Sequence, residues 1–185
     1  MATTDRSAVW RPLAWRGSDQ CSLWRDSSGW RMEGIALATP PDGAPAQVRY
    51  TVHCAPDWTT REATVDLRTP AELHFLDLRQ RDGRWYVNGR EVEALRGCQD
   101  VDFGFTPATN TLPIRRLELA PGESRDVSAA WVRYPELTIE PLPQRYTRLG
   151  DDRYRYESGT GFSAELVVDN AGLVLEYPGA WQRVG

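Results

Sequence analysis

The sequence predicts a mainly β protein built from a single curved antiparallel sheet. Apolar or aromatic residues alternate with charged residues in many short runs, which is typical of antiparallel strands with one face on the core and one in water. Asn-Gly and Asp-Gly pairs separate several runs and favour tight hairpins between consecutive strands. About ten strands without a domain break should curl, so we expect an open or partly closed β-barrel or roll with one or two short helices. We expect one domain over residues 1–185.

The clearest alternation lies in residues 47–54, where one side carries Val48, Tyr50, Val52 and Cys54. Residues 63–68 repeat the pattern. In residues 72–80 we expect Leu73 and Phe75 on the apolar side, with a local slip in the alternation at Leu76 and Leu78.

The turns predict a meander. Asp82-Gly83 and Asn88-Gly89 bracket residues 84–87, and a turn at 169–172 separates residues 164–168 from 173–177. A short helix is expected from Asn110 or Thr111, because proline is tolerated in a first helical turn and Pro113 stands there. The proline-rich residues 133–146 should lie at an edge, a bulge or a rim crossing.

Composition restricts the class of partner. The hydrophobic fraction of 41% and the eight tryptophans supply enough apolar area for a core, and the net charge is −4 with every one of the 22 basic residues an arginine. A nucleic acid partner is not expected, because phosphate binding needs a basic excess. The chain shows no signal-peptide pattern and no apolar run of transmembrane length, so we expect a cytoplasmic protein.

Cys21, Cys54 and Cys98 are widely spaced and odd in number, which predicts free thiols. We assign no metal site, cofactor or catalytic residue. His53 and His74 have no partner at ligand spacing and are expected at the surface or rim.

A neutral stretch runs from Gly104 to Ile114 and ends at Arg115 and Arg116. Its uncharged hydrogen-bonding groups, Thr106, Asn110 and Thr111 among them, suit a sugar or other polyhydroxy head group. The alternative is a structural loop whose polar side chains satisfy their own backbone. The two arginines either grip an anion or pair with Asp100 or Asp102.

Asp100 and Asp102 stand two positions apart, so a strand would place both carboxylates on one face. They form a pair of functional acids or a solvated face. Trp58, Trp85 and Trp131 either line a cavity for an acyl chain or pack in the core.

The stretch GCQDVDFGFTPATNTLPIRRL, together with blocks such as GWRMEGIAL, RWYVNGREV and GFSAELVVDNAGLVLEYPGAWQRV, resembles a bacterial family named "putative glycolipid-binding", formerly a domain of unknown function. The resemblance spans nearly the whole chain. It implies a curved antiparallel sheet, similar to the half-barrels of bacterial lipoprotein carriers, and a role in binding a glycolipid. It implies no catalytic residues.

We therefore expect a protein that binds an amphiphile or glycolipid, with the tail in the hollow of the sheet and the head group near Asp102, Thr106, Asn110, Thr111, Arg115 and Arg116. Trp58, Trp85 and Trp131 would contact the tail. One alternative is an enzyme that uses Asp100 or Asp102 as general base, and another is a structural or partner-binding module with a filled core. The ligand and the oligomeric state are left open.

Overall fold

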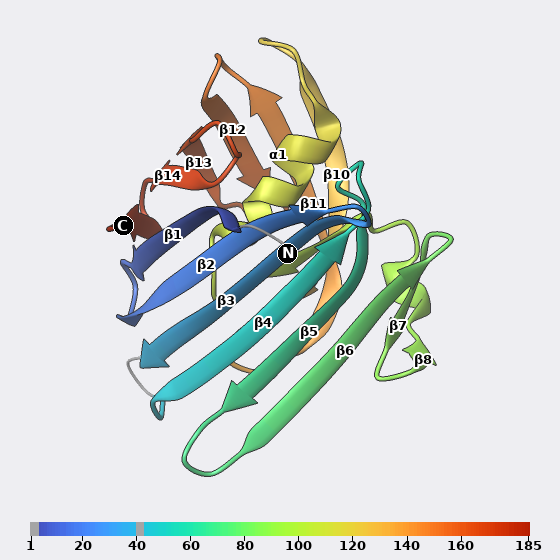
Figure 1. Cartoon of the computed structure of the whole chain (residues 1–185), viewed down its shortest axis with the longest axis vertical. Coiled ribbons are helices and arrows are strands. Elements are labelled where there is room, and N and C mark those ends of the chain that lie inside the picture. Colours follow the sequence, from blue (N-terminus) through green and yellow to red (C-terminus); the bar gives the residue numbers. More distant parts are fainter. Residues whose placement is uncertain (1–3, 40–42) are drawn as a thin grey trace.

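The structure, a computed structural model, describes residues 4–39 and 43–185. Within these residues, fifteen strands form one sheet in the order β8-β7-β6-β5-β4-β3-β2-β1-β15-β14-β13-β12-β11-β10-β9, drawn in Figure 1. The first eight strands are neighbours in sequence, and so are the last seven. The expected meander is therefore confirmed from β1 to β8 and from β10 to β15, with more strands than the alternation alone indicated, whereas β9 pairs with β10 in parallel.

The strands of the first half are β1 (Thr4–Pro12), β2 (Arg16–Asp26), β3 (Gly29–Thr39), β4 (Ala46–Cys54), β5 (Thr60–Arg68), β6 (Leu73–Arg81), β7 (Arg84–Val87) and β8 (Arg90–Glu91). A 3-10 turn, η1 (Glu93–Leu95), leads into the second half. There the strands are β9 (Asp100–Phe103), β10 (Ser124–Val132), β11 (Ile139–Arg148), β12 (Arg153–Ser158), β13 (Ser163–Val168), β14 (Val174–Tyr177) and β15 (Trp181–Arg183).

The two halves are joined where the first strand pairs with the last. Trp10 in β1 stands opposite Arg183 in β15, and the buried Trp10 indole donates a hydrogen bond to the carbonyl of Val174 at 2.8 Å. The outermost strands, β8 and β9, do not pair with each other, so the sheet is open and not a closed barrel.

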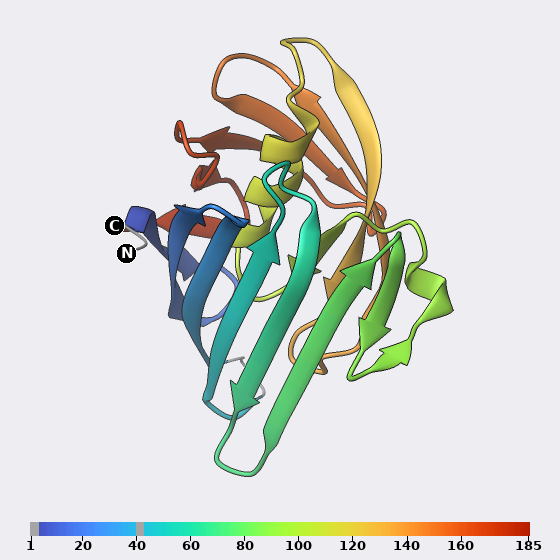
Figure 2. The same ribbon diagram turned by 45° about the vertical axis from the view of Figure 1, so that its right-hand side comes forward.

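The crossover between β9 and β10 fills part of the hollow of the sheet. These two strands are parallel, and a parallel pair needs a crossover connection. The crossover contains η2 (Ala108–Asn110) and α1 (Thr111–Leu117), which lie between the N-terminal strands and those of the second half (Figure 1, Figure 2). The expected short helix is confirmed.

Burial explains why the stretch before Arg115 is neutral. Every residue from 105 to 114 is buried, and an unpaired charge in that position would be costly to desolvate. The helix ends at Leu117, and the next residue, Glu118, adopts a left-handed conformation with φ of 46°.

The two-residue hairpins are confirmed at Asp82-Gly83 and Asn88-Gly89. Their φ values are 51° and 74° in the first turn and 49° and 79° in the second. Positive φ at both central residues is the type I′ geometry that matches the twist of paired strands.

The predicted faces of β6 were wrong. Leu73 and Phe75 are 74% and 60% exposed, whereas Leu76 and Leu78 stand opposite Val65 and Ala63 of β5 on the core side. The alternation is continuous, with no slip. The prediction failed at the start of β6, where the strand extends past β7. The two strands pair only from Leu78 onward. His74 is exposed, as expected.

The prolines of β11 lie where the strand has a neighbour on one side only. Pro141 and Pro143 pair with β10, but the pairing with β12 begins at Gln144. Because proline donates no backbone hydrogen bond, this local edge accommodates it, as expected.

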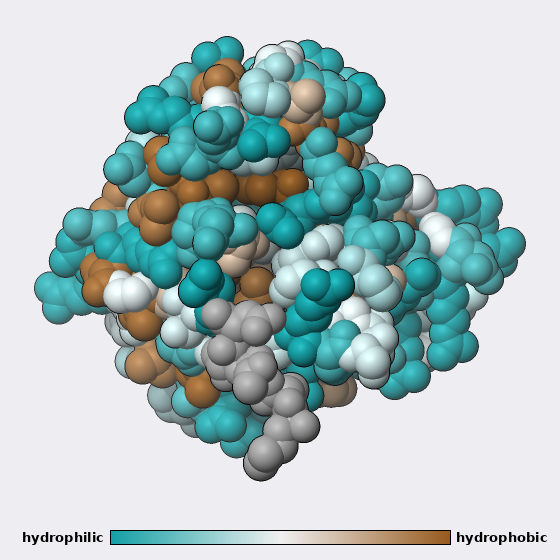
Figure 3. All heavy atoms as spheres, turned by 45° about the horizontal axis from the view of Figure 1, so that its top comes forward, coloured by the Kyte–Doolittle hydropathy of each residue, from teal (hydrophilic) through white to brown (hydrophobic). Residues whose placement is uncertain are grey.

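The three cysteines are free and buried, as expected. Charged and polar residues cover most of the face in Figure 3, with hydrophobic residues gathered in a band below its upper margin. No helix within the described residues has the length and apolar character needed to span a membrane.

Candidate functional site

A cavity of about 440 Å³ opens beside the buried 105–114 segment. Its walls come from β9 to β12, from the end of the chain around β14 and β15, and from the β1–β2 loop. It is lined by Ala14, Trp15, Asp102, Phe103, Gly104, Thr106, Asn110, Trp131, Leu142, Tyr156, Ser158, Thr160, Phe162, Tyr177, Gly179, Ala180 and Trp181. The exposed members of this lining, which lie nearest its mouth, are Ala14, Gly104, Thr160, Phe162 and Gly179.

One polar group on the cavity wall is a carboxylate held from two sides. Asp102 accepts hydrogen bonds from the Thr109 hydroxyl at 2.9 Å and from the Gln144 amide at 2.6 Å. The same Gln144 nitrogen donates to the Tyr156 hydroxyl at 3.1 Å. Burial raises the pKa of Asp102, and the bonds from Thr109 and Gln144 partly oppose that rise. A carboxylate has about four lone-pair sites, so Asp102 can accept further donors from a ligand.

Thr106 and Asn110 also line the cavity, but the protein already uses most of their bonding capacity. The Thr106 hydroxyl donates to Asp19 at 2.5 Å and accepts from the Ala108 N–H at 3.0 Å. The Asn110 oxygen accepts from the Tyr146 hydroxyl at 2.9 Å, and its amide nitrogen donates to the Pro107 carbonyl at 3.1 Å. These bonds fix the shape of the segment that forms this wall.

Asp19, which anchors Thr106, is fully buried in β2. It also accepts from the Tyr50 hydroxyl, which lies 3.2 and 3.0 Å from its two oxygens. Burial raises the pKa of Asp19 to about 7, although the bonds from Thr106 and Tyr50 act to lower it. This carboxyl is therefore protonated in a fraction of the molecules near neutral pH.

Aromatic rings form much of the remaining wall. Trp15 meets Trp181 edge to face with ring centroids 5.5 Å apart, and Tyr177 lies 5.9 Å from Phe162 and 6.3 Å from Tyr156. Such surfaces contact apolar chains or the faces of sugar rings, while their polar atoms bind hydroxyl groups.

Four of the residues proposed from the sequence line this cavity: Asp102, Thr106, Asn110 and Trp131. The other five, Thr111, Arg115, Arg116, Trp58 and Trp85, lie outside its lining.

The side chains of these five residues contact other residues of the protein. Thr111 donates to the Gly172 carbonyl at 3.0 Å, and Arg115 lies 5.6 Å above the Trp58 ring. Trp58 stacks on Trp30 at 4.2 Å.

Trp85 is fully buried and donates its indole N–H to the Cys98 carbonyl at 2.9 Å. Arg116 makes a bidentate pair with the Asp100 carboxylate at 3.0 and 2.6 Å. Burial raises the pKa of Asp100, and the bonds and charge of Arg116 oppose that rise. The predicted pairing of the arginines with Asp100 or Asp102 is confirmed for this pair.

Sequence reasoning missed the aromatic wall and the anchor beneath it, that is, Trp15, Tyr156, Phe162, Tyr177, Trp181 and Asp19. Tyr154 and Tyr156 do alternate with charged residues in β12, and that pattern could have pointed to a buried tyrosine face. Asp19 gave no such signal, since nothing local distinguishes it from a surface acid.

Comparisons with known proteins agree with this architecture. A crystal structure of a DUF1089 family protein from Pseudomonas aeruginosa is 35% identical, with a TM-score of 0.81 over 90% of this chain and 92% of its own. A beta-barrel-like protein of domain of unknown function DUF1849 from Brucella abortus shares the fold, with a TM-score of 0.54 and 10% identity over 96% of this chain and 94% of its own. No curated protein matches the chain. The model of the family described as "Putative glycolipid-binding" matches residues 7–183, and the chain belongs to that family.

Proposed function

We propose that the protein binds an amphiphile, a glycolipid or a glycolipid precursor, in the cavity beside the 105–114 segment. The observation that carries the proposal is the composition of this one cavity, in which a half-buried carboxylate and several hydroxyls share the lining with tryptophan, tyrosine and phenylalanine rings. The family description supports the same class of ligand. Because the cavity is open, we favour a ligand-binding role over the alternative of a structural module with a filled interior.

The head group would meet the wall formed by Asp102, Gln144 and Tyr156. Sugar hydroxyls would donate to the Asp102 carboxylate, whose two oxygens are held in place by Thr109 and Gln144. A sugar ring would lie against the aromatic side chains. Ser158 and Thr160, which also line the cavity, would supply further hydroxyls.

The tail would occupy less of the sheet than the sequence led us to expect, because α1 and Phe105 already fill part of the hollow. A cavity of about 440 Å³ lies toward the lower end of the range for small-molecule pockets. It would hold a head group or a short chain segment, with the rest of the ligand leaving past Phe162. Each buried methylene would contribute about 0.8 kcal/mol.

The test is to isolate the protein from its own host, identify co-purifying lipid by native mass spectrometry and organic extraction, and measure binding of that lipid. Ala180→Phe would place a ring in the cavity, and we expect it to abolish binding. Ala94→Phe puts the same ring on an exposed position of η1 and should leave binding intact. Failure to recover lipid, together with no lipid transfer in vitro by the native protein, would overturn the proposal.

The alternative prediction, an enzyme with an acid at position 100 or 102 as general base, now rests on Asp102. Asp100 is engaged by Arg116, whereas Asp102 lines the cavity and has a raised pKa. Incubation of the recovered lipid with the protein separates the two functions. Turnover that Asp102→Asn abolishes would indicate the enzyme, and unchanged lipid would indicate the binder.

A further inference from the structure

A second, more polar pocket lies where the terminal strand β9 meets β5. The Val101 N–H in β9 donates to the Thr60 hydroxyl in β5 at 3.4 Å, which holds the two strands together across the hollow. Beside this contact is a pocket of about 440 Å³ lined by Asp57, Thr59, Gln80, Gly83, Gly97, Cys98, Gln99 and Arg116. It shares no lining residue with the aromatic cavity.

Gln80 is the unusual residue of this pocket. It is only 8% exposed, yet its side-chain oxygen is buried with no hydrogen-bond partner among the described protein groups. Gln80 stands opposite the buried Trp85 in the β6–β7 pair, on the inner face of the sheet. A buried acceptor without a donor costs about 1–3 kcal/mol, and a leucine there would avoid that cost. Because Gln80 also lines the pocket, a small movement of its side chain would let the amide oxygen accept from a ligand there.

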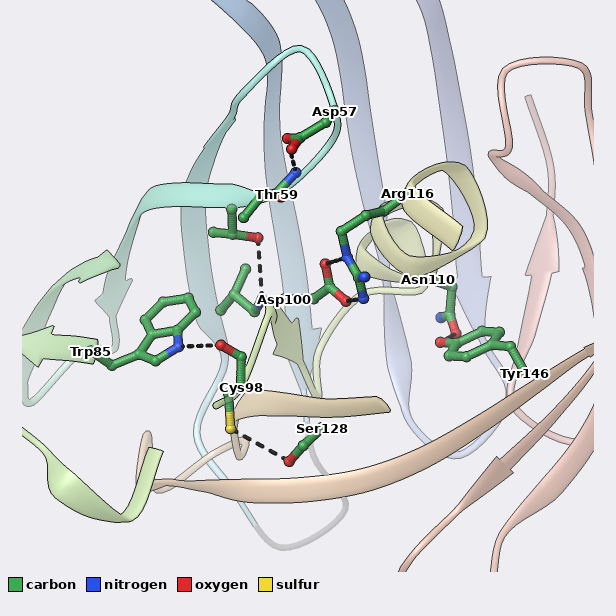
Figure 4. Close-up of polar contacts among 11 residues, drawn as sticks. Asp57, Thr59, Trp85, Cys98, Asp100, Asn110, Arg116, Ser128 and Tyr146 are labelled. Atoms are coloured by element: carbon green, nitrogen blue, oxygen red, sulfur yellow. Dashed lines mark hydrogen bonds and ion pairs between the residues drawn. The ribbon is translucent and has the colours of Figure 1, made fainter. Parts of the chain in front are cut away.

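The surrounding groups are held in fixed positions. The Trp85 indole donates to the Cys98 carbonyl at 2.9 Å, and the Cys98 thiol lies 3.4 Å from the Ser128 hydroxyl (Figure 4). On the opposite side, the Thr59 N–H donates to Asp57 at 3.0 Å, and this bond lowers the pKa of Asp57. The pocket thus combines an ionised carboxylate with an unpartnered amide oxygen.

The charges select the class of ligand. The lining holds one guanidinium, Arg116, which Asp100 engages through Nε and Nη2, and one carboxylate, Asp57, whose pKa the charge of Arg61 helps to lower. It therefore has no excess of positive charge that would bind an anion. Gln80 and Asp57 need donors, while the remaining Arg116 nitrogen and the Gln80 amide nitrogen offer donors. Hydroxyl groups both donate and accept. We propose that this pocket is a second binding site, for a small uncharged polyhydroxy molecule such as a monosaccharide or cyclitol.

The experiment titrates the full-length protein with D-glucose, D-galactose, D-mannose and myo-inositol, each in turn, while recording amide NMR spectra. With at least one probe we expect shifts of the Gln80 side-chain amide and of the Gly83 and Gly97 backbone amides, and a rise in the melting temperature. Inorganic phosphate should produce neither effect. Absence of these shifts with all four probes would show that Gln80 is merely hydrated, and would overturn the proposal.

Gln80→Leu supplies the decisive variant. Without a probe it should melt at a higher temperature than the native protein, because it removes the unpartnered oxygen, and it should lose the response to the probe. Gln47→Leu makes the same change on β4, outside this lining, and should retain the response. Ala180→Phe should also retain it, since it alters only the aromatic cavity. A response that survives in Gln80→Leu would contradict the assignment of the site.

Discussion

The hydroxyl of Thr106 donates a 2.5 Å hydrogen bond to the buried carboxylate of Asp19, 87 positions earlier in the chain. The bond joins β2, in the N-terminal half of the sheet, to the segment that forms one wall of the aromatic cavity. The protonation of Asp19 therefore bears on both the stability of the fold and the support of the cavity wall.

Asp19→Asn should reduce the pH dependence of stability. Burial raises the pKa of Asp19 from its ordinary value of 3.8 to about 7 in the folded protein, so between these two pH values the folded state binds more protons than the unfolded state. Its contribution to the free energy of unfolding is therefore present below pH 4 and falls as the pH rises to 7. The free energy of unfolding of the asparagine variant minus that of the native protein should be more positive at pH 8 than at pH 5. Urea denaturation at both pH values measures this, and an identical difference at both would contradict it.

Gly34→Ala should destabilise the protein although the substitution is small. A Cβ at Gly34 would lie 2.3 Å from the ring and hydroxyl of Tyr50, which must then move away from Asp19. Overpacking of this kind costs about 1–3 kcal/mol. Gly150→Ala is the matched control, because its Cβ would meet nothing within 4 Å. Equal free energies of unfolding for the two variants would argue against the close contact.

Arg116→Met should lower the free energy of unfolding more than the removal of both members of its ion pair does. Asp100 is 1% exposed, and a buried carboxylate without its partner costs about 3–5 kcal/mol. The Asp100→Asn, Arg116→Met double variant should therefore be more stable than Arg116→Met alone. The loss in the single variant should shrink at acidic pH, where Asp100 becomes protonated. A double-mutant cycle at two pH values tests both statements, and additive effects would contradict them.

Trp10→Phe should weaken the junction between the two halves of the sheet. The substitution removes the indole donor of the buried Val174 carbonyl and leaves a space in the core. We expect a loss of about 2–4 kcal/mol, since an unsatisfied acceptor and a cavity contribute together. Hydrogen exchange should show faster opening of β1 and β15 than of β4. Uniform exchange in all three strands would place the effect elsewhere.

The sequence by itself determined the local elements. The alternation in residues 47–54 and 63–68, the hairpins at Asp82-Gly83 and Asn88-Gly89, and the helix around Pro113 all formed as predicted. Each depends on side-chain period or on backbone conformations that particular residues favour within a few positions. The neutral run before Arg115 correctly marked an unusual segment, and its burial is the reason for its neutrality.

Only the tertiary structure decided which polar groups share a cavity. Gln144 in β11 links Asp102 in β9 to Tyr156 in β12, because its amide nitrogen donates to both. Asp19 reaches Thr106 because the sheet curls around α1. The same curl brought Arg116 to Asp100 and left the Gln80 side-chain oxygen without a hydrogen-bond partner among the described residues. These relationships depend on sheet curvature and on pairing between distant strands, whose energies come from packing across the whole core and leave no signal within a short window of sequence.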